Sequence, residues 1–460
     1  MKEKFDVIVI GMGPGGEEVA EQLAEAGLAV AGVEMNLVGG ECPYWGCIPS
    51  KAIIRAADAL AEGRRIPELA GSATITPDWA PVARRLRDQI TDNWDDRVAV
   101  ERFERKGGNF FRGRGRLAGP GKVQVGDTVL EASRAVVINT GTSPAIPPIP
   151  GLDGVQYWTN REAIEAEQLP ESLLVMGGGA IGAELAQAFA RFGVRVTVVE
   201  AADRILALEE PEAGEVLAGV FEREGIEVLT SARVESAATG EGVTRLTLAG
   251  GKTVEAERLL VATGRRPNLR DLGLETVGLD PGQHFLPVDD HLRAAPGVWG
   301  VGDITGKGAF THVSVYQARI AIADILGRPA PAADYRALPR VTFTDPEVGA
   351  VGLTEAEARK KGIQVRSGSS PLSYSTRGFI HGPGNDGFIK LVEDAERGVL
   401  VGGSTAGPSG GEMISMLCVA VAMEVPTERL RHMIWAYPTF HRGIEGALQA
   451  LARPAMEPVG

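Results

Sequence analysis

The sequence has little positive charge for its size and no long apolar stretch. Its 60 acidic residues outnumber its 47 lysines and arginines, and the formal net charge is −13. Nucleic acids and anionic membranes attract basic patches, so this balance argues against both as partners. The apolar run at residues 7–10 is far too short to cross a bilayer, and nothing resembles a secretion signal. We expect a cytoplasmic protein whose 460 residues form about three domains.

Cysteine is also scarce, with thiols only at Cys42, Cys47 and Cys418. A structural zinc site needs four ligands, usually from two CxxC pairs, so these three cysteines argue against one. Two thiols five positions apart can instead cycle between dithiol and disulfide, provided that a partner delivers or removes two electrons. A reducing cytoplasm suits a pair that must cycle rather than stay oxidised. We predict a redox pair at Cys42 and Cys47 and no bound metal, with a chance spacing as the alternative.

A nucleotide-binding pattern opens the chain. Residues 5–27 are typical of an apolar strand, a turn containing Gly11, Gly13 and Gly16, and a helix. Glu34 follows the next apolar run at the spacing of a carboxylate that binds a ribose. Glycines at these positions let the backbone approach a pyrophosphate at the helix N-terminus. A plain strand–helix turn is the alternative, but strand, helix and acid together favour a dinucleotide, and a flavin would supply the electrons.

The same pattern recurs at residues 173–200. A second apolar strand leads to Gly177, Gly179 and Gly182, a helix, and Glu200. Such an internal repeat predicts a second dinucleotide-binding fold. Two folds imply two nucleotides, and a flavin needs a nicotinamide partner with which to exchange hydride.

The segment around the cysteines carries a family resemblance. Residues 39–51, GGECPYWGCIPSK, resemble the motif GGTCLNVGCIPSK of FAD-dependent pyridine nucleotide-disulfide oxidoreductases, especially the dihydrolipoamide dehydrogenase and mercuric reductase branch. The resemblance extends over essentially the whole chain. It implies an α/β fold with two Rossmann-like domains, for FAD and NAD(P), and a C-terminal α+β dimerisation domain. The expected sections are FAD 1–148, NAD(P) 149–268, FAD again 269–335, and dimerisation 336–460.

The resemblance also implies roles for the redox residues. Cys47 would face the flavin and Cys42 would meet the substrate, at the entrance of a helix whose dipole favours thiolate. Lys51 would lie near the flavin ring and pair with Glu184. A solvated lysine and an ordinary helix acid are the alternatives.

Further positions match the FAD contacts of the family. Asp303 should accept a hydrogen bond from the ribityl chain, and residues 309–312 should open a helix along the isoalloxazine. As isolated turns, Gly115, Thr140 and Gly141 would be unremarkable. The implied FAD residues are Gly11, Gly13, Gly16, Glu34, Lys51, Gly115, Thr140, Gly141, Gly302, Asp303, Ala309 and His312.

The second nucleotide fold indicates a preference for NADH. A carboxylate at Glu200 can bond both ribose hydroxyls of NAD and would repel the 2′-phosphate of NADP. Arg204, four residues on, could reach a phosphate and keeps NADP(H) open. The implied NAD residues are Gly177, Gly179, Gly182, Glu200, Val234 and Gly264.

The C-terminus departs from the family. Disulfide reductases of this group end in an HPTxxE-like motif whose histidine and glutamate serve the partner subunit's thiol. The aligned stretch here is WAYPTFHRGIE, so Tyr437 replaces the histidine and Arg442 the glutamate. A tyrosine is a poor base near neutral pH but a usable proton donor.

A replacement base is offered by the next residues. Apolar positions from 440 to 451 predict an amphipathic helix capped by Thr439, on which His441 and Glu445 are four apart and can hydrogen-bond. We hypothesise that His441, oriented by Glu445 and aided by Tyr437, handles protons for Cys42 of the other subunit. An interface histidine without that role is the alternative.

Two other stretches yield structural expectations. Residues 78–106 predict one long exposed helix containing Trp94, without chemistry. The redox loop has Glu41 where the family has threonine. It also places Tyr44 and Trp45 between the cysteines, where they could narrow access, stack a flat acceptor or simply pack.

Together these patterns predict a homodimeric FAD enzyme that moves electrons between NADH and a small disulfide or dithiol, like dihydrolipoamide dehydrogenase. One alternative is an NAD(P)H dehydrogenase for quinones or other acceptors. A mercuric reductase would need further cysteines, including a pair near the C-terminus, and residues 451–460 hold none. A non-enzymatic flavin sensor or assembly component is a third class.

Overall fold

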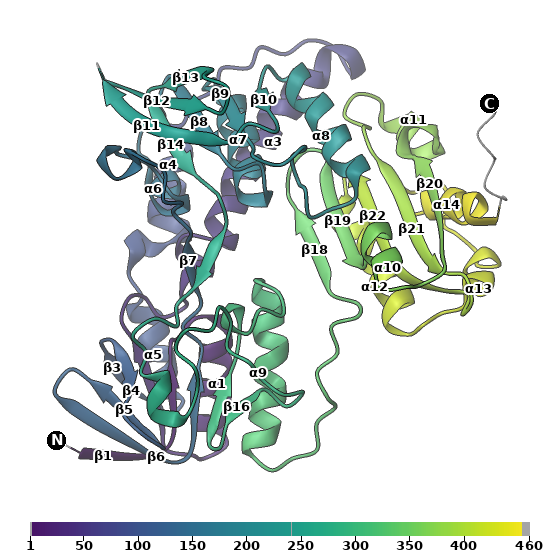
Figure 1. Cartoon of the computed structure of the whole chain (residues 1–460). Coiled ribbons are helices and arrows are strands. Elements are labelled where there is room, and N and C mark those ends of the chain that lie inside the picture. Colours follow the sequence, from purple (N-terminus) through teal and green to yellow (C-terminus); the bar gives the residue numbers. More distant parts are fainter. Residues whose placement is uncertain (1, 241, 453–460) are drawn as a thin grey trace. The chain divides into compact units, whose positions relative to one another are not determined.

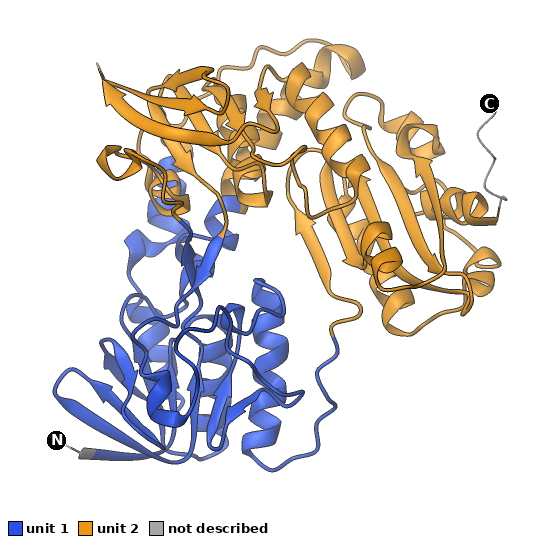
Figure 2. Ribbon diagram, in the orientation of Figure 1, with its two compact units in different colours: residues 1–50, 83–145, 265–334 blue, residues 51–82, 146–264, 335–460 orange. Residues whose placement is uncertain are grey.

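The computed structural model describes residues 2–240 and 242–452 and divides into two compact units (Figure 2). Unit 1 consists of residues 1–50, 83–145 and 265–334, and unit 2 consists of residues 51–82, 146–264 and 335–460. Each unit is assembled from three separate stretches of chain. Both mix helices and strands, which confirms the predicted α/β class.

Unit 1 is organised around one twisted sheet of eight strands (Figure 1). The strand order is β16-β17-β6-β1-β2-β3, and β4 and β5 continue from β6 as a meander. Strands β17, β6, β1, β2 and β3 run parallel. The strands are β1 (Lys2–Ile10), β2 (Val30–Glu34), β3 (Asn109–Arg112), β4 (Gly115–Leu117), β5 (Lys122–Val125), β6 (Thr128–Ile138), β16 (Arg293–Ala295) and β17 (Val298–Gly300).

The apolar run of β1 is buried on both faces of this sheet. Val7 and Val9 lie in the cluster that contains residues of α1 and α9, whereas Ile8 and Ile10 lie in the cluster on the other face. Because strand side chains alternate between faces, a run without polar residues is what a doubly covered strand requires. Helices α1 (Pro14–Glu25) and α9 (Thr311–Ile325) both cover the face that carries Val7 and Val9.

The other elements of unit 1 connect these layers. They are α2 (Glu41–Tyr44), η1 (Leu86–Ile90), η2 (Asp92–Trp94), α5 (Arg97–Arg105), β7 (Thr142–Pro144), β15 (Arg265–Pro267), η4 (Leu274–Val277) and η5 (Asp303–Thr305). Two helices contain a boundary between the units: α3 (Cys47–Leu69) and α4 (Ala80–Arg85).

The predicted long helix over residues 78–106 is wrong. That stretch is divided among α4, η1, η2 and α5, and all three residues of η2 have positive φ. Asp96 accepts hydrogen bonds from Val38 N and Arg112, at 2.7 and 2.5 Å, immediately before α5 starts. The Trp94 indole donates to Tyr44 O at 3.2 Å. These contacts with distant segments interrupt the helix despite its favourable local composition.

Unit 2 contains a second parallel sheet, in the order β10-β9-β8-β14, and an antiparallel meander, β11-β12-β13. This is the nucleotide-binding repeat that the sequence predicted. Its elements are η3 (Leu152–Gly154), α6 (Asn160–Glu165), β8 (Ser172–Met176), α7 (Ala180–Arg191), β9 (Arg195–Val199), α8 (Pro211–Arg223), β10 (Glu227–Leu229), β11 (Val234–Gly240), β12 (Val243–Leu248), β13 (Thr253–Ala256) and β14 (Arg258–Val261).

The C-terminal part of unit 2 is an antiparallel sheet, β18-β19-β22-β21-β20. Side chains of α12 and α14 share one apolar core with its strands. The elements are β18 (Pro339–Thr342), β19 (Glu347–Gly352), α10 (Glu355–Lys360), β20 (Val365–Pro371), η6 (Leu372–Tyr374), α11 (Thr376–His381), β21 (Phe388–Asp394), β22 (Val399–Gly407), α12 (Gly410–Ala422), α13 (Thr427–Arg431) and α14 (Gly443–Ala452).

Across the described part of the chain, every helix is too short or too polar to span a bilayer.

Candidate active site

The two predicted redox thiols are adjacent in unit 1. Cys42 lies in α2 and is half-buried, and Cys47 is the exposed first residue of α3. Both are present as free thiols, joined by a hydrogen bond. The Cys47 sulfur also lies 3.4 Å from the hydroxyl of Thr311, the first residue of α9. Two sulfurs in contact at the start of a helix can exchange thiol and disulfide states.

The two sulfurs differ in their environment. The hydrogen bond with Cys47 and burial raise the pKa of the Cys42 thiol, and a hydrogen bond from Thr311 lowers it. A raised pKa keeps Cys42 protonated near neutral pH, so its attack on a disulfide needs a proton acceptor. Cys47 has the N-terminal end of a helix to favour its thiolate.

The glycine turn of unit 1 fits a pyrophosphate. Gly11 has φ of 92°, and a Cβ there would lie 2.3 Å from the carbonyl oxygen of Asn139. A Cβ at Gly16 would lie 2.0 Å from Gly11 O, so strand and helix meet through bare backbone. Gly13, the residue before α1, has no neighbour closer than 3.4 Å to such a Cβ. Gly11 and Gly16 are tightly packed against backbone, whereas Gly13 leaves space at the N-terminus of α1 for an anion.

The acids expected to bind FAD are held in place. The Glu34 carboxylate is buried and accepts from the backbone N–H groups of Met12 and Asn36, at 2.9 and 2.7 Å. Asp303 accepts from the Thr142 hydroxyl at 2.7 Å. Burial raises the pKa of the Asp303 carboxyl, although the Thr142 hydrogen bond opposes the shift. Glu34 is the last residue of β2, and Asp303 begins η5 shortly after β17, so both carboxylates follow parallel strands at the end where nucleotide hydroxyls bind.

Glu41, the unusual residue of the redox loop, belongs to a chain of contacts that ends at Asp303. Its carboxylate lies 3.4 Å from the Arg265 guanidinium. Arg265 donates to the hydroxyl and carbonyl oxygens of Thr142, at 2.7 and 2.8 Å, and Thr142 donates to Asp303. The sequence did not predict Arg265 or Thr142, because the chain separates them by more than a hundred residues.

Asn139 is another residue that sequence reasoning missed. Its buried side chain accepts from Gly16 N at 2.8 Å and donates to Val301 O at 2.7 Å. It therefore ties the glycine turn to the segment before η5. Its position at the end of β6 was the only available signal.

The remaining predicted FAD residues occupy turns and helix starts in unit 1. Thr140 Oγ1 donates to Asn268 O, and Gly302 N donates to Gln317 Oε1. Gly141 and Gly302 have positive φ, as a turn without Cβ allows. Gly115 begins β4. Ala309 and His312 flank the start of α9, which confirms that a helix opens there.

The glycine turn of unit 2 repeats the first geometry. A Cβ at Gly182 would lie 1.9 Å from Gly177 O, whereas Gly179 has no neighbour within 4 Å of such a Cβ. Glu200 accepts from the backbone N–H groups of Gly178 and Ala202, at 2.6 and 2.7 Å. The carboxylate is thus fixed beside the glycine turn, as in unit 1.

Arg204 is engaged by its own loop. Its guanidinium donates to the carbonyl oxygens of Ala207 and Glu209, at 3.1 and 3.4 Å, and to the Asp203 carboxylate at 3.2 Å. Among the other predicted NAD residues, Val234 begins β11, and Gly264 has φ of 115° with open space around it.

Lys51 and Glu184 form the expected ion pair. Lys51 Nζ lies 2.7 Å from one Glu184 oxygen, and the other oxygen accepts from Phe343 N at 2.8 Å. The Lys51 ammonium also lies 4.6 Å from the centre of the Phe343 ring. Phe343 was not predicted from the sequence.

The predicted partnership of His441 with Glu445 is wrong. Helix α14 begins at Gly443, so His441 lies in the preceding turn and the four-residue spacing no longer places the two side chains together. Glu445 pairs with Arg442 at 3.1 Å, and His441 lies 3.4 Å from Thr439 Oγ1. Thr439 donates to Ala436 O and does not cap the helix.

Tyr437 is largely exposed to solvent, and one face of its ring contacts a guanidinium. Arg442 lies over its ring at 4.9 Å from the centre. Arg442 also pairs with Glu445 at 3.1 Å, so it contacts both side chains, and the tyrosine hydroxyl is a group that can donate a proton.

The two aromatics of the redox loop have different environments. Tyr44 is buried and packs against Trp45, which is half-buried. Burial raises the pKa of Tyr44 to about 12, so the phenol stays neutral. Tyr44 therefore packs the loop and is not available to stack an acceptor.

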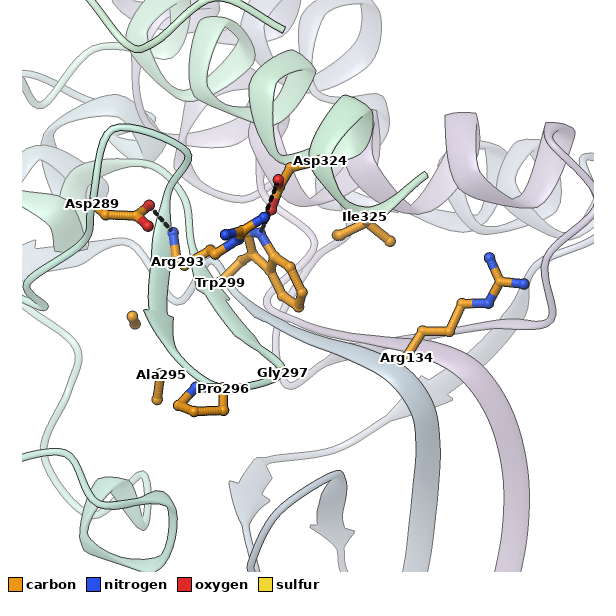
Figure 3. A pocket seen from close by; sticks show the side chains of 10 residues that line it. Arg134, Asp289, Arg293, Ala295, Pro296, Gly297, Trp299, Asp324 and Ile325 are labelled. Carbon is orange, nitrogen blue, oxygen red and sulfur yellow. Dashed lines mark hydrogen bonds and ion pairs between the residues drawn. The ribbon is translucent and has the colours of Figure 1, made fainter. Parts of the chain in front are cut away.

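A separate pocket of about 640 Å³ lies at the β16–β17 hairpin of unit 1 (Figure 3). Arg293 and Trp299 line it, and both donate to Asp324, at 2.5 and 2.9 Å. None of the predicted site residues lines it. Within the described residues, no group of three or more His, Cys, Asp or Glu side chains could hold a metal ion.

Comparison with known proteins gives the same family over both units. Residues 5–318 match the family model described as pyridine nucleotide-disulphide oxidoreductase, and residues 338–448 match the dimerisation domain of that family. Dihydrolipoyl dehydrogenase of Chlorobaculum tepidum is 34% identical over 97% of this chain and 97% of its own. Mercuric reductase of Acidithiobacillus ferrooxidans is 34% identical over 98% of this chain and 83% of its own.

A solved structure agrees. The crystal structure of LpdA from Mycobacterium tuberculosis matches with a TM-score of 0.85 at 29% identity, covering 98% of this chain and 100% of that one. The protein is an oxidoreductase that uses FAD and NAD(P)H, and its C-terminal domain supports a homodimer. By its sequence match and its fold, the chain belongs to the pyridine nucleotide-disulphide oxidoreductase family.

Proposed function

We propose that this enzyme uses NADH to reduce a small disulfide, with Cys42 as the sulfur that meets the substrate and Cys47 as its internal partner. The observation that carries the proposal is the contact between the two thiols beside Thr311. Because Dihydrolipoyl dehydrogenase is among the relatives, a dithiolane-type disulfide or its dithiol is the first-choice substrate, in either direction.

The substrate disulfide is reduced in two thiol–disulfide exchange steps. The Cys42 thiolate attacks one sulfur of the substrate disulfide, forms a mixed disulfide and expels the other sulfur, which takes up a proton. The Cys47 thiolate then attacks the Cys42 sulfur and expels the second substrate thiolate, which is also protonated. The products are a substrate dithiol and a Cys42–Cys47 disulfide. FAD, when bound, supplies the two-electron transfer that returns this disulfide to the dithiol at the expense of NADH.

Proton handling follows from the sulfur environments. Cys42 is protonated near neutral pH, so a base must accept its proton and an acid must protonate the leaving thiolate. We assign the acid role to Tyr437 of the second subunit, with Arg442 holding the ring.

The preference for NADH rests on the loop after β9. Glu200 is fixed as a carboxylate acceptor for ribose hydroxyls. Both terminal nitrogens of Arg204 already bind backbone carbonyls or Asp203, and only its buried Nε has no hydrogen-bond partner within the described residues, so few of its donors are left for a 2′-phosphate.

A Cys42→Ser variant tests the proposal. It should abolish NADH-dependent reduction of a dithiolane disulfide, while NADH-dependent reduction of a quinone survives, because quinone reduction does not need the sulfur couple. Retention of disulfide reduction by the variant would rule out the assigned role of Cys42.

An NAD(P)H dehydrogenase for quinones is a second candidate function. The pairing of Glu445 with Arg442 favours it, because no histidine–carboxylate pair stands at that position within the described residues. Wild-type kcat/KM for a quinone well above that for any small disulfide would favour this candidate over the first.

A further inference from the structure

One face of α7 binds the loop that follows β18. Gln187 exchanges two hydrogen bonds with the backbone of Asp345, both at 2.7 Å, and Arg191 contacts the Asp345 carboxylate at 2.7 Å. Glu184 accepts from Phe343 N at 2.8 Å. These three side chains are three and four residues apart and therefore share one helix face. Helix α7 therefore holds the loop at Phe343 and Asp345.

Helix α3 binds the same loop and the same helix face. Lys51, Asp58 and Arg65 are spaced by seven residues, so they also share a face. Asp58 contacts Arg191 at 2.6 Å, and Arg65 contacts the Asp345 carboxylate at 2.6 Å. The Arg191 side chain is almost fully buried within this network. Asp345 binds both Arg191 and Arg65, so more than one ion pair would have to break before the loop could shift.

Phe343 is the residue of this loop that contacts both members of the Lys51–Glu184 pair. Its N–H fixes the orientation of the Glu184 carboxylate, and its ring lies 4.6 Å from the Lys51 ammonium. Glu184 is buried, but a third of the Lys51 side chain remains exposed. Water weakens an ion pair in which one partner is partly exposed, and the four flexible methylenes of lysine let its ammonium move away from the carboxylate. A cation over an aromatic face adds an attraction of similar size.

We propose that Phe343 is a positioning residue that holds the Lys51 ammonium in its pair with Glu184. The proposal rests on the proposed function and on the family resemblance, which implies that Lys51 lies near the flavin. The backbone N–H sets the carboxylate and the ring confines the ammonium, so one residue determines the geometry of both charges. A leucine at 343 keeps the N–H and apolar bulk but loses the π face, which separates the two contributions.

Phe343→Leu is the first test. With a quinone as the electron acceptor of the FAD-loaded enzyme, we expect kcat for NADH oxidation to fall about five- to tenfold, with the KM for NADH within about twofold of wild type. Phe343→Tyr keeps the ring and should restore wild-type kcat. Should the leucine variant fail to fold, Phe343→Met, which is also apolar and without a π face, takes its place. An equal loss in the tyrosine variant would overturn the proposal.

The reduction potential of the bound flavin gives a readout apart from turnover. A positive charge held nearby favours the reduced form, so the leucine variant should have a more negative potential and the tyrosine variant an unchanged one. In a Lys51→Met background, Phe343→Leu should produce no further shift, because the ring has lost its cation. A further shift of equal size there would show that the ring acts independently of Lys51.

Phe388→Leu is the matched control. Phe388 is a buried phenylalanine of β21 in the same domain, so its loss lowers stability without touching the ion pair. The control should lower the melting temperature and leave the potential unchanged. A wild-type potential in folded Phe343→Leu would overturn the proposal. These measurements involve no disulfide acceptor, so a failed role for Cys42 would appear only in the Cys42→Ser experiment.

Discussion

The sulfur of Cys47 lies 3.4 Å from the hydroxyl of Thr311. Each residue is the first of its helix, Cys47 of α3 and Thr311 of α9. The hydroxyl also hydrogen-bonds the Cys42 thiol and lowers its pKa. Thr311 is therefore a side chain in unit 1 that can stabilise negative charge on either sulfur.

Removing this hydroxyl should slow disulfide reduction. We expect Thr311→Val, which keeps the shape, to reduce kcat/KM for a small disulfide about five- to tenfold at neutral pH, because one hydrogen bond to thiolate is lost. Thr311→Ser should retain most of the rate. Stopped-flow measurement of disulfide reduction checks both, and a valine variant as fast as wild type would contradict the assigned role.

The raised pKa of Cys42 predicts an alkaline pH profile. Hydrogen bonding to Cys47 and burial raise this pKa, so the thiolate fraction at neutral pH is small and increases about tenfold per pH unit below the pKa. We expect kcat/KM for disulfide reduction to keep increasing from pH 6 to 9. Quinone reduction, measured in the same buffers, should not follow that slope. A plateau below pH 7 in the disulfide profile would contradict the expectation.

The two glycines of the NAD turn should fail in different ways. A Cβ at Gly182 would lie 1.9 Å from backbone oxygen, so Gly182→Ala should lower the free energy of unfolding by about 1–3 kcal/mol. Gly179 has open space, so Gly179→Ala should fold within about 0.5 kcal/mol of wild type. Its KM for NADH should nevertheless rise about tenfold, because the methyl group occupies the approach to the pyrophosphate. Thermal unfolding and steady-state kinetics separate the two effects.

Glu200 should determine the choice of nicotinamide. Glu200→Arg replaces a ribose acceptor with a phosphate donor, so the KM for NADH should rise about tenfold or more and the preference should move toward NADPH. Glu200→Gln is the matched control, because its amide oxygen can still accept from Gly178 N. An arginine variant with the wild-type ratio of NADH to NADPH efficiency would count against NADH selection by this residue.

His441 should be dispensable and Tyr437 should not. Because Glu445 is occupied by Arg442, we expect His441→Ala to keep disulfide reduction within about twofold of wild type. Tyr437→Phe removes the proton donor and should lower disulfide reduction about 10²-fold, with quinone reduction unchanged. A large loss in His441→Ala together with a normal Tyr437→Phe would restore histidine as the base.

The nucleotide-binding turns were predictable because their decisive contact is local. Gly16 approaches the carbonyl of Gly11, and Gly182 that of Gly177, five residues apart in each unit. The same spacing therefore produced the same geometry twice. The contacts of Asn139 with Gly16 and of Arg265 with Thr142 were not predictable, because they join segments more than a hundred residues apart.

The start of α14 was not predictable from the apolar periodicity of its sequence. Apolar spacing correctly identified Ile444, Ala447, Leu448 and Leu451 as the buried face. It did not specify the first residue of the helix, and the turn at residues 440–442 left His441 outside it. A shift of three residues in the start of the helix was enough to change which side chain pairs with Glu445.

The sequence by itself determined the two dinucleotide folds, their carboxylates and the thiol pair, since each depends on residues close together along the chain. Only the tertiary structure decided which groups surround them. Thr311 lies beside the Cys47 sulfur, Phe343 contacts both Lys51 and Glu184, and Arg442 pairs with Glu445. Hydrogen bonds and ion pairs act over a few ångström, and packing of distant segments sets which side chains come that close.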